Sequence, residues 1–322
     1  MSKEITDVTV VGAGYMGGGI AQSLALGGYD VTIADADEEK SAQALNRLLK
    51  EAKEFENQGL FLPGSSETIA QHLKNGGSIE NAVKNADFVE EAVFEVPDVK
   101  LSVLERICRT APIDAIIGTN TSTIPVHILE PAVTNPERFL TVHFSNPAPF
   151  IPGVELVASD KTSQATIDSV KEVLARCGRE GAQVADKPGM VLNRLQYALL
   201  KEACNVVEEN VATVEDVDTI VRTTFGFRLG FFGPFAIADQ AGLDVYANCF
   251  KTFEDAYGKR LATPPLLKEE VSDGRLGIKN GKGITGDFDA ESKNELVAYR
   301  NKAYAKMQLL LAELGPAPQG HS

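Results

Sequence analysis

Short apolar runs alternate with amphipathic stretches along the first half of the chain. Residues 6–12 form a β-branched run that ends in glycine, small and apolar residues follow at helical spacing over 20–27, and residues 29–35 form a second short run. This order predicts a strand, a helix and a second strand. Further strand-like runs lie at residues 86–93, 115–120, 139–144 and 154–159. Strands that alternate with helices in this way predict a mostly parallel, doubly wound sheet covered on both faces.

The pattern changes after "DKPGMVLNRLQ" (186–196), where apolar residues recur at spacings of three and four and strand-like runs end. We therefore expect an α/β domain over residues 1–187 and an all-helical domain over 188–322, with Pro188-Gly189 as the hinge. The last long helical stretch, about 290–314, carries one apolar stripe. The pattern leaves open whether this stripe packs on its own domain or contacts a second subunit. Its members are Val297, Tyr304, Met307, Leu311 and Leu314.

Composition narrows the class of protein. A length of 322 residues suits two domains, and a net charge of -14 opposes binding to nucleic acid or to an anionic membrane. Apolar runs stay shorter than the roughly 18 residues that a membrane span needs, so we expect a cytoplasmic protein. The four cysteines lack the spacing of a metal site or a disulfide framework, and we expect mostly buried free thiols and no bound metal.

A glycine motif follows the first predicted strand. The stretch "VVGAGYMGGG" places Gly12, Gly14 and Gly17 in the order G-x-G-x-x-G at the start of the predicted helix. In this motif the first glycine makes a tight turn, the second lets the backbone approach a diphosphate, and the third lets the helix pack closely. Free amides at the helix N-terminus hold the diphosphate. The motif predicts a dinucleotide site in a Rossmann-like domain, and we assign Tyr15 and Met16 to the same site.

Asp35 ends the second predicted strand, eighteen residues after Gly17. A carboxylate at this place accepts hydrogen bonds from the 2′-hydroxyl of the adenosine ribose and repels a 2′-phosphate. We therefore expect NAD rather than NADP. FAD is an alternative, because flavoproteins use the same opening, and so is a glycine turn that only lets a helix cross a strand.

His143 is the strongest candidate for acid–base chemistry. It lies at the end of the predicted strand 139–144, and ligands of open α/β sheets bind outside the carboxyl ends of strands. As a general base it would accept the proton of a substrate hydroxyl. Glu155, twelve residues later, would orient the imidazole, although a solvated strand carboxylate fits the spacing equally well. The prolines of "NPAPFIP" (146–152) fix φ and stiffen the connection between the two residues.

Two further polar groups are candidates for the substrate side. "GTNTSTIP" (118–125) ends another predicted strand at the same edge of the sheet, and it contains Asn120 and Ser122. Ser122 is placed either to donate a hydrogen bond to a substrate oxygen or to cap a helix. Asn193, early in the first helix of the second domain, either faces the cleft or points to solvent. Spacing alone does not decide between these roles.

Together these blocks resemble one family, the NAD-dependent L-3-hydroxyacyl-CoA dehydrogenases and their relatives. The resemblance runs in order through nearly the whole chain, which makes it highly specific. The matching blocks are "VVGAGYMGGGIA", "EEAVFEVPDVK", "NTSTIP", "HFSNPAPFIPGVELV", "KPGMVLNRL", "DQAGLDV" and "PPLLKEEVSDGRLGIKNGKG".

The resemblance implies roles for individual side chains. His143 corresponds to the catalytic base, Glu155 to its partner, and Ser122 and Asn193 to donors toward the substrate oxygens. The resemblance also implies a Rossmann-like domain followed by a helical domain that usually mediates dimerisation, so we expect a homodimer formed through the C-terminal domain.

The cofactor side follows from the same resemblance. Glu95 and Lys100 match family positions near the cofactor's ribose and nicotinamide, and Asn146 matches a polar group beside the nicotinamide. We assign Asn120, which precedes the serine segment, to the cofactor site as well. The expected partners are NAD and a small-molecule substrate.

Two features differ from the acyl-CoA enzymes of the family. Those enzymes usually have a lysine where this chain has Pro152, and they end soon after the position of Gly283. Both differences resemble relatives that act on free hydroxy acids or hydroxymethyl compounds, such as gulonate, carnitine and pyridine-carboxylate dehydrogenases. We therefore expect a CoA-free small hydroxy acid or alcohol as substrate, with an L-3-hydroxyacyl-CoA as the alternative. A crystallin-like NAD-binding protein without turnover is the alternative of another class.

Overall fold

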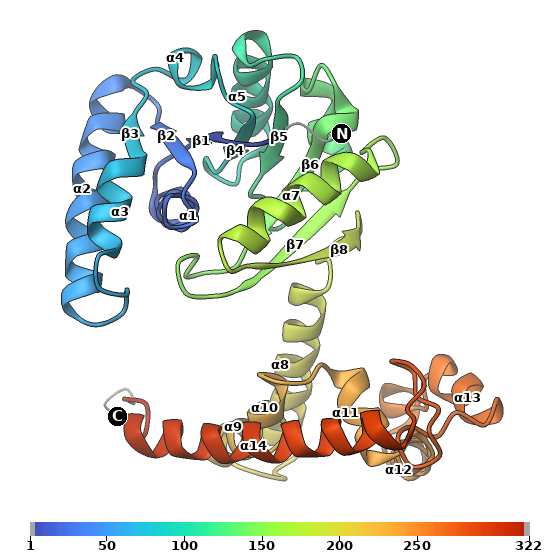
Figure 1. The fold of residues 1–322 in the computed structure, drawn as a ribbon. Coiled ribbons are helices and arrows are strands. Elements are labelled where there is room, and N and C mark those ends of the chain that lie inside the picture. The colour runs from blue at the N-terminus through green and yellow to red at the C-terminus, as the bar shows by residue number, and fades with distance from the viewer. Residues whose placement is uncertain (1–3, 319–322) are drawn as a thin grey trace. The chain divides into compact units, whose positions relative to one another are not determined.

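The computed structural model describes residues 4–318 of the chain (Figure 1). The chain divides into two compact units, residues 1–199 and 200–322, of which the first is α/β and the second helical. The sequence predicts a division after residue 187. Helix α8 (Leu192–Glu208) begins in the first unit and ends in the second.

The first unit is built on an eight-stranded sheet with the order β3-β2-β1-β4-β5-β6-β7-β8. Neighbouring strands pair in parallel except β6 and β7, which pair antiparallel. The mostly parallel, doubly wound sheet that the sequence predicts is thereby confirmed. The strands are β1 (Asp7–Val11), β2 (Asp30–Ala34), β3 (Leu73–Asn75), β4 (Phe88–Glu91), β5 (Ile116–Thr119), β6 (Phe139–Phe144), β7 (Gly153–Ala158) and β8 (Glu180–Ala185).

Helices cover both faces of this sheet (Figure 1). Buried side chains of α1, α2, α3 and α7 pack against one face, and those of α4, α5 and α6 against the other. The carboxyl ends of β1, β4, β5 and β6 therefore meet at one edge, where loops are free to carry functional groups. These helices are α1 (Tyr15–Leu26), α2 (Glu38–Asn57), α3 (Ser65–His72), α4 (Ile79–Val83), α5 (Pro97–Thr110), α6 (Val126–Leu129) and α7 (Gln164–Arg176).

Helix α2 illustrates how local sequence defines an element. Asp37 accepts a hydrogen bond from the Lys40 amide, and an N-cap of this kind stabilises a helix by about 1 kcal/mol. Ser41, Ala44, Leu48 and Ala52 are buried at spacings of three and four residues, as an amphipathic helix on a sheet requires.

Two strands, β3 and β8, are not predicted from the sequence pattern. β3 spans only three residues, and β8 has the sequence "EGAQVA" with mostly exposed side chains, so neither forms an apolar run. β8 pairs in parallel with β7 and extends the sheet beyond the predicted strands. Edge strands of this kind lack the burial that makes a strand visible in a sequence.

Within residues 200–318 the second unit is helical and, in place of a sheet, has two isolated β-bridges, Gly277–Lys282 and Lys282–Asp287. Buried Asp239 organises its loop region by accepting hydrogen bonds from the Ile284 amide and from the amide and hydroxyl of Thr285. Its helices after α8 are α9 (Val214–Thr223), α10 (Phe225–Leu229), α11 (Pro234–Ala241), α12 (Leu243–Tyr257), α13 (Pro265–Ser272) and α14 (Ala290–Leu314).

Helix α14 carries the apolar stripe that the sequence predicts, and the stripe has two different environments. The ring of Tyr304 lies 5.5 Å from that of Phe227 and 6.2 Å from that of Phe232, measured between centroids, so this part packs on its own unit. Leu311 and Leu314, in contrast, are 37% and 69% exposed.

The cysteines and the hydropathy of the helices were both subjects of expectations from the sequence. All four cysteines are free, but Cys204 and Cys249 are exposed, so the expectation of mostly buried thiols is wrong for these two. Both lie on helices whose outer faces are largely exposed in the single chain. Among residues 4–318, none of the helices is long and apolar enough to cross a membrane.

Candidate functional site

The glycine turn between β1 and α1 has the geometry of a dinucleotide site. Gly12 has a φ of +93°, and a Cβ there would lie 2.7 Å from the backbone of Ala92. A Cβ on Gly17 would lie 1.8 Å from the Gly12 oxygen, whereas one on Gly14 would meet no atom within 4 Å. Glycine is therefore required for the turn and for helix packing at 12 and 17, and it leaves an open approach at 14.

The end of β2 faces the same turn. The Asp35 carboxylate accepts hydrogen bonds from the amides of Ala13, at 2.9 Å, and Ala36, at 2.7 Å. Arg47 of α2 donates to the carbonyl of Ala13 at 2.6 Å, a contact that the sequence did not suggest. The Ala13 peptide is thus held on both sides, which fixes the loop that follows Gly12. An arginine in α2 has no motif spacing that would single it out.

His143 and Glu155 lie opposite each other on the antiparallel strands β6 and β7. Imidazole Nδ1 is 2.9 Å from the Glu155 Oε2 atom, and the two side chains are only 9% and 12% exposed. A carboxylate at Nδ1 fixes the ring orientation and leaves Nε2 as the nitrogen that can accept a proton. The pair has the arrangement of a base and the carboxylate that orients it.

Glu155 has a second set of partners at the start of α8. Its Oε1 atom accepts hydrogen bonds from the amides of Val191 and Leu192, both at 2.9 Å. The same carboxylate therefore orients the imidazole and caps the helix that carries Asn193. The Asn193 side-chain amide in turn lies 3.4 Å from the carbonyl oxygen of Ser122. Ser122 and Asn193, predicted from separate segments, are brought together.

Glu95 organises the segment that carries Ser122. Its Oε1 atom accepts hydrogen bonds from the hydroxyl of Thr121 at 2.6 Å and from the amides of Ser122 and Thr123, both at 2.9 Å. Burial would raise the pKa of Glu95, but these hydrogen bonds and the charge of Lys100 outweigh it and lower the pKa. Glu95 therefore stays ionised and holds the serine segment in place.

Lys100 lies beneath this segment rather than on its surface. Its fully buried ammonium is 2.9 Å from Glu91 Oε1 and 3.6 Å from Glu95 Oε2. Thr119 donates to Glu91 Oε2 at 2.6 Å and completes this network. The sequence indicated Lys100 and Glu95 but missed Glu91 and Thr119. A carboxylate at the end of a strand has the same sequence pattern whether it pairs with a buried lysine or is hydrated.

The two remaining asparagines occupy neighbouring loops. Asn120 Oδ1 accepts a hydrogen bond from the amide of Phe144 at 2.9 Å and so ties the end of β5 to the end of β6. Asn146 is exposed and lies in the connection between β6 and β7. Tyr15 is 69% exposed at the first residue of α1 and Met16 is partly buried behind it. All of these groups stand at the carboxyl edge of the sheet.

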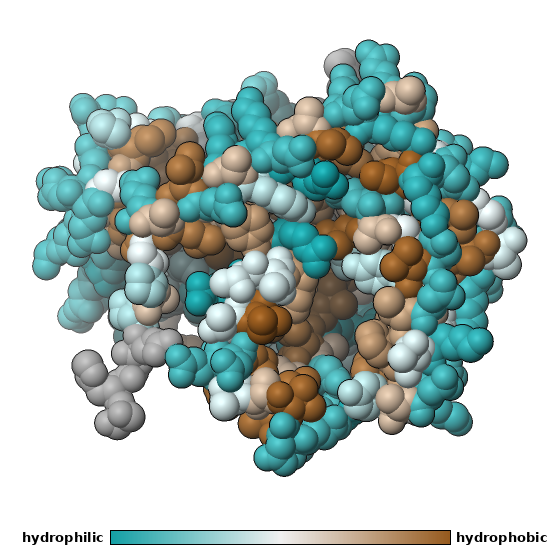
Figure 2. Space-filling model, turned by 90° about the horizontal axis from the view of Figure 1, so that it is seen from below, coloured by the Kyte–Doolittle hydropathy of each residue, from teal (hydrophilic) through white to brown (hydrophobic). Residues whose placement is uncertain are grey.

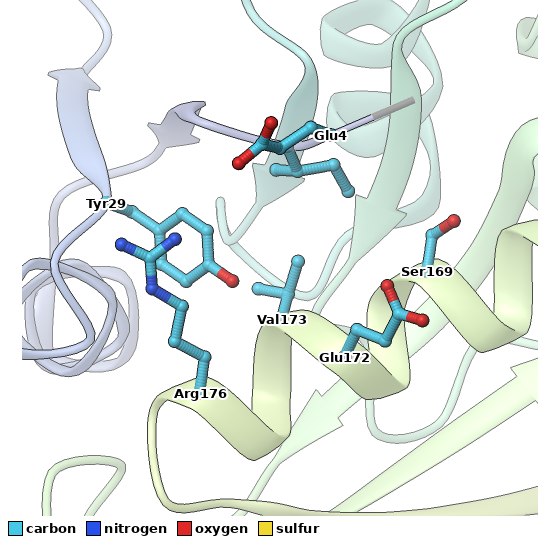
Figure 3. Close-up of a pocket in the computed structure, with 7 residues that line it drawn as sticks. Glu4, Tyr29, Ser169, Glu172, Val173 and Arg176 are labelled. Atoms are coloured by element: carbon cyan, nitrogen blue, oxygen red, sulfur yellow. The ribbon is translucent and has the colours of Figure 1, made fainter. Parts of the chain in front are cut away.

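A separate hollow of about 310 Å³ lies at the amino ends of β1 and β2 (Figure 3). Here the Arg176 guanidinium lies over the ring of Tyr29, 4.3 Å from its centroid. Glu4 and Glu172 also line the hollow, which lacks any of the predicted site residues. The candidate site is therefore the carboxyl edge of the sheet and not this hollow.

The residues at this edge fit a bound NAD. The open face of Gly14 and the first turn of α1 suit a diphosphate, and the carboxylate of Asp35 suits a ribose without a 2′-phosphate. Across the described part of the chain, His, Cys, Asp and Glu side chains do not form a group of three or more that could hold a metal ion. At the same edge, His143 at the end of β6 supplies a buried imidazole, a group that can accept or donate a proton.

Comparison with known proteins agrees with this geometry. The family model described as "3-hydroxyacyl-CoA dehydrogenase, NAD binding domain" matches residues 7–187, and that of the C-terminal domain of the same family matches residues 189–286.

Individual relatives carry two kinds of name. The chain is 33% identical to 5-formyl-3-hydroxy-2-methylpyridine 4-carboxylate 5-dehydrogenase of Mesorhizobium japonicum, over 92% of this chain and 97% of that protein. It is 31% identical to a probable 3-hydroxybutyryl-CoA dehydrogenase of Bacillus subtilis, over 90% and 99%. The crystal structure of a 3-hydroxyacyl-CoA dehydrogenase of Archaeoglobus fulgidus superposes with a TM-score of 0.78 at 31% identity, covering 96% and 99%. The chain therefore belongs to the 3-hydroxyacyl-CoA dehydrogenase family of NAD-dependent oxidoreductases.

Proposed function

We propose that the protein oxidises a hydroxyl-bearing carbon near a carboxylate or carbonyl group, with His143 as the general base. The observation that carries this proposal is the buried contact of 2.9 Å between His143 Nδ1 and Glu155 Oε2. It leaves Nε2 to accept the hydroxyl proton, and the carboxylate stabilises the imidazolium that forms. Proton transfer to a positioned imidazole typically accelerates a reaction about 10²- to 10⁴-fold.

Each of the other site groups has a defined part in this reaction. NAD, held by the glycine turn and Asp35, would supply the acceptor for the hydride of the carbinol carbon. Ser122 and Asn193 donate hydrogen bonds to the oxygen that becomes a carbonyl, and so stabilise the charge that develops there. Glu95 keeps Ser122 in position through the amide hydrogen bonds of its segment.

For the substrate we propose a small hydroxy acid or alcohol without CoA. The Mesorhizobium relative, named for a pyridine carboxylate, matches this chain over nearly its full length. Residues 287–322, with all of α14, lie beyond the matched C-terminal domain. The net charge of -14 also disfavours a polyanionic CoA ligand. The relatives named for 3-hydroxybutyryl-CoA favour the CoA thioester as the second candidate.

A substrate panel separates the two candidates. The purified enzyme is assayed for NADH formation with free 3-hydroxy acids, carnitine, gulonate and hydroxymethyl pyridine carboxylates, and in the reverse direction with acetoacetyl-CoA. We expect the highest kcat/KM on one of the CoA-free compounds. A kcat/KM on acetoacetyl-CoA above that of every free acid or alcohol would overturn the proposed substrate class but not the proposed base.

The assembly that we propose is a homodimer formed through the C-terminal unit. Few apolar residues of 200–318 are buried, namely Phe232, Ile237, Leu243, Leu267 and Ala303. Large apolar side chains of this unit instead remain exposed, among them Leu309, Leu310 and Leu314. Figure 2 shows brown patches between polar ones on the face of the molecule that is drawn. Apolar side chains that a single copy leaves exposed in this way support a contact with a partner.

Light scattering after size-exclusion chromatography tests this assembly. The wild-type mass should be twice that of the 34.5 kDa chain. Leu310→Glu, in the exposed end of α14, should shift the mass toward the monomer. Leu62→Glu in the first unit, which changes a side chain that is 80% exposed, serves as the control and should stay dimeric. A monomeric wild-type protein would refute the dimer.

A further inference from the structure

The connection between β6 and β7, residues 145–152, links the two catalytic strands, and we call it the proline loop. His143 precedes it, Glu155 follows it, and Asn146 is part of it. Its prolines restrict φ, but they do not determine where the loop lies relative to the glycine turn. That position depends on contacts with other elements.

Arg179, the residue before β8, supplies the polar part of these contacts. One guanidinium nitrogen, Nη2, lies 2.7 Å from the carbonyl oxygen of Pro149, and the other, Nη1, lies 3.3 Å from that of Ile151. Nη2 also lies 3.1 Å from the hydroxyl of Ser23 in α1. The guanidinium thus joins the loop to the helix whose first turn faces the diphosphate site.

Apolar packing supports the same placement. A Cβ on Gly19 of α1 would lie 2.8 Å from the Pro149 side chain, so helix and loop are in direct contact. The ring of Phe150 lies 5.5 Å from that of Phe55 and 5.8 Å from that of Phe61, measured between centroids. These apolar contacts and the hydrogen bonds of Arg179 hold the same loop.

The guanidinium of Arg179 makes hydrogen bonds to the loop and to Ser23 rather than an ion pair. Within residues 4–318 the structure has no carboxylate within ion-pair distance of this guanidinium. Its charge is directed at carbonyl and hydroxyl oxygens, and such charge-assisted hydrogen bonds are roughly twice as strong as neutral ones. A planar fork can hold two carbonyls at once, which a lysine ammonium cannot do in the same geometry.

We propose that Arg179 is a positioning residue of the reaction, which holds the proline loop against α1 so that Asn146 meets the nicotinamide end of NAD. This inference rests on the proposed function. The diphosphate and ribose contacts belong to the glycine turn and Asp35, and the His143–Glu155 contact belongs to the strand ladder. Loss of Arg179 therefore lowers kcat without a comparable change in NAD affinity or in the pH profile.

The test compares Arg179→Ala with Arg179→Lys and with a matched control, Arg176→Ala, in the same segment of the chain. Arg176 donates to the carbonyl of Gly28 at 2.8 Å, at the amino end of the sheet. We expect Arg179→Ala to lower kcat about 10- to 100-fold, because misplacement by about 1 Å has effects of this size. The Kd of NAD should stay within about twofold. Arg176→Ala should keep the wild-type kcat.

Chemical rescue distinguishes positioning from general stability. Low concentrations of ethylguanidinium should restore part of the kcat of Arg179→Ala. The kcat of Arg179→Lys should lie between that of Arg179→Ala and that of the wild type. A kcat of Arg179→Ala equal to wild type, or a loss that tracks the melting temperature and resists rescue, would overturn the inference. If Arg179→Ala does not fold, Ser23→Ala and Arg179→Lys carry the test, and each should lower kcat, though by less than the fall expected for Arg179→Ala. Wild-type enzyme without NADH formation would instead overturn the proposed function.

Discussion

Glu90 offers a sharp physical prediction because it is a carboxyl group buried in the sheet without partners. It is 0% exposed on β4, and neither of its oxygens has a hydrogen-bond partner in the described structure. It pairs in register with Gly118 of β5, where a Cβ would lie 2.1 Å from Glu90 Oε2. Burial, followed by the charge of Glu91, raises the pKa of Glu90 well above its usual value, and Lys100 opposes this only in part.

The sign of the effect on stability follows directly. The folded protein keeps the Glu90 proton at a pH where the unfolded chain has released it. The contribution of Glu90 to the free energy of unfolding is therefore fully present below the ordinary pKa of the carboxyl group. It is lost as the pH rises toward the raised pKa of the folded protein. The slope reaches about 1.4 kcal/mol of unfolding free energy for each pH unit in that interval.

The variant Glu90→Gln removes the titration while nearly keeping the volume. Urea unfolding followed by circular dichroism, between about pH 5 and pH 8, gives the free energy of unfolding for both proteins. We expect the wild type to lose stability relative to Glu90→Gln as pH rises. Glu67→Gln, on the exposed side of α3, is the control and should give a difference that does not vary with pH. A constant difference for Glu90→Gln as well would refute the reasoning.

Three further predictions concern the site. Glu155→Gln should lower kcat about 10²- to 10⁴-fold while NAD still binds, because an amide facing Nδ1 favours the wrong imidazole tautomer; steady-state kinetics and calorimetric titration with NAD check this. Gly14→Ala should melt at the wild-type temperature but bind NAD about tenfold more weakly in the same titration, because its Cβ meets only open space that the diphosphate would occupy. Asp35→Asn should raise the kcat/KM ratio of NADP to NAD about tenfold, since it removes the charge that repels a 2′-phosphate; an unchanged ratio would argue against this role.

Local sequence was sufficient to predict the glycine turn and the carboxylate that faces it. The turn at Gly12, the close packing at Gly17 and the carboxylate at Asp35 all act within one strand–helix–strand unit, so their spacing already contains the geometry. The strands that carry His143 and Glu155 were also predicted near their observed bounds.

What escaped prediction depends on contacts between distant segments. The antiparallel register that places His143 opposite Glu155 is a property of the strand pair and not of either strand alone. The capping of α8 by Glu155 and the hold of Arg179 on the proline loop join residues far apart in the chain. β8 was not predicted because most of its side chains are exposed, so its sequence lacks an apolar run.

NADH formation by His143→Gln, on the best substrate of the panel, tests the central claim most directly. His72→Gln is the matched control, because His72 also contacts a carboxylate, Asp30, at 3.1 Å but lies outside the site. We predict that His143→Gln loses at least about 10²-fold in kcat and keeps wild-type affinity for NAD, while His72→Gln keeps full turnover. Near-normal turnover by His143→Gln would contradict the assignment of His143 as the base.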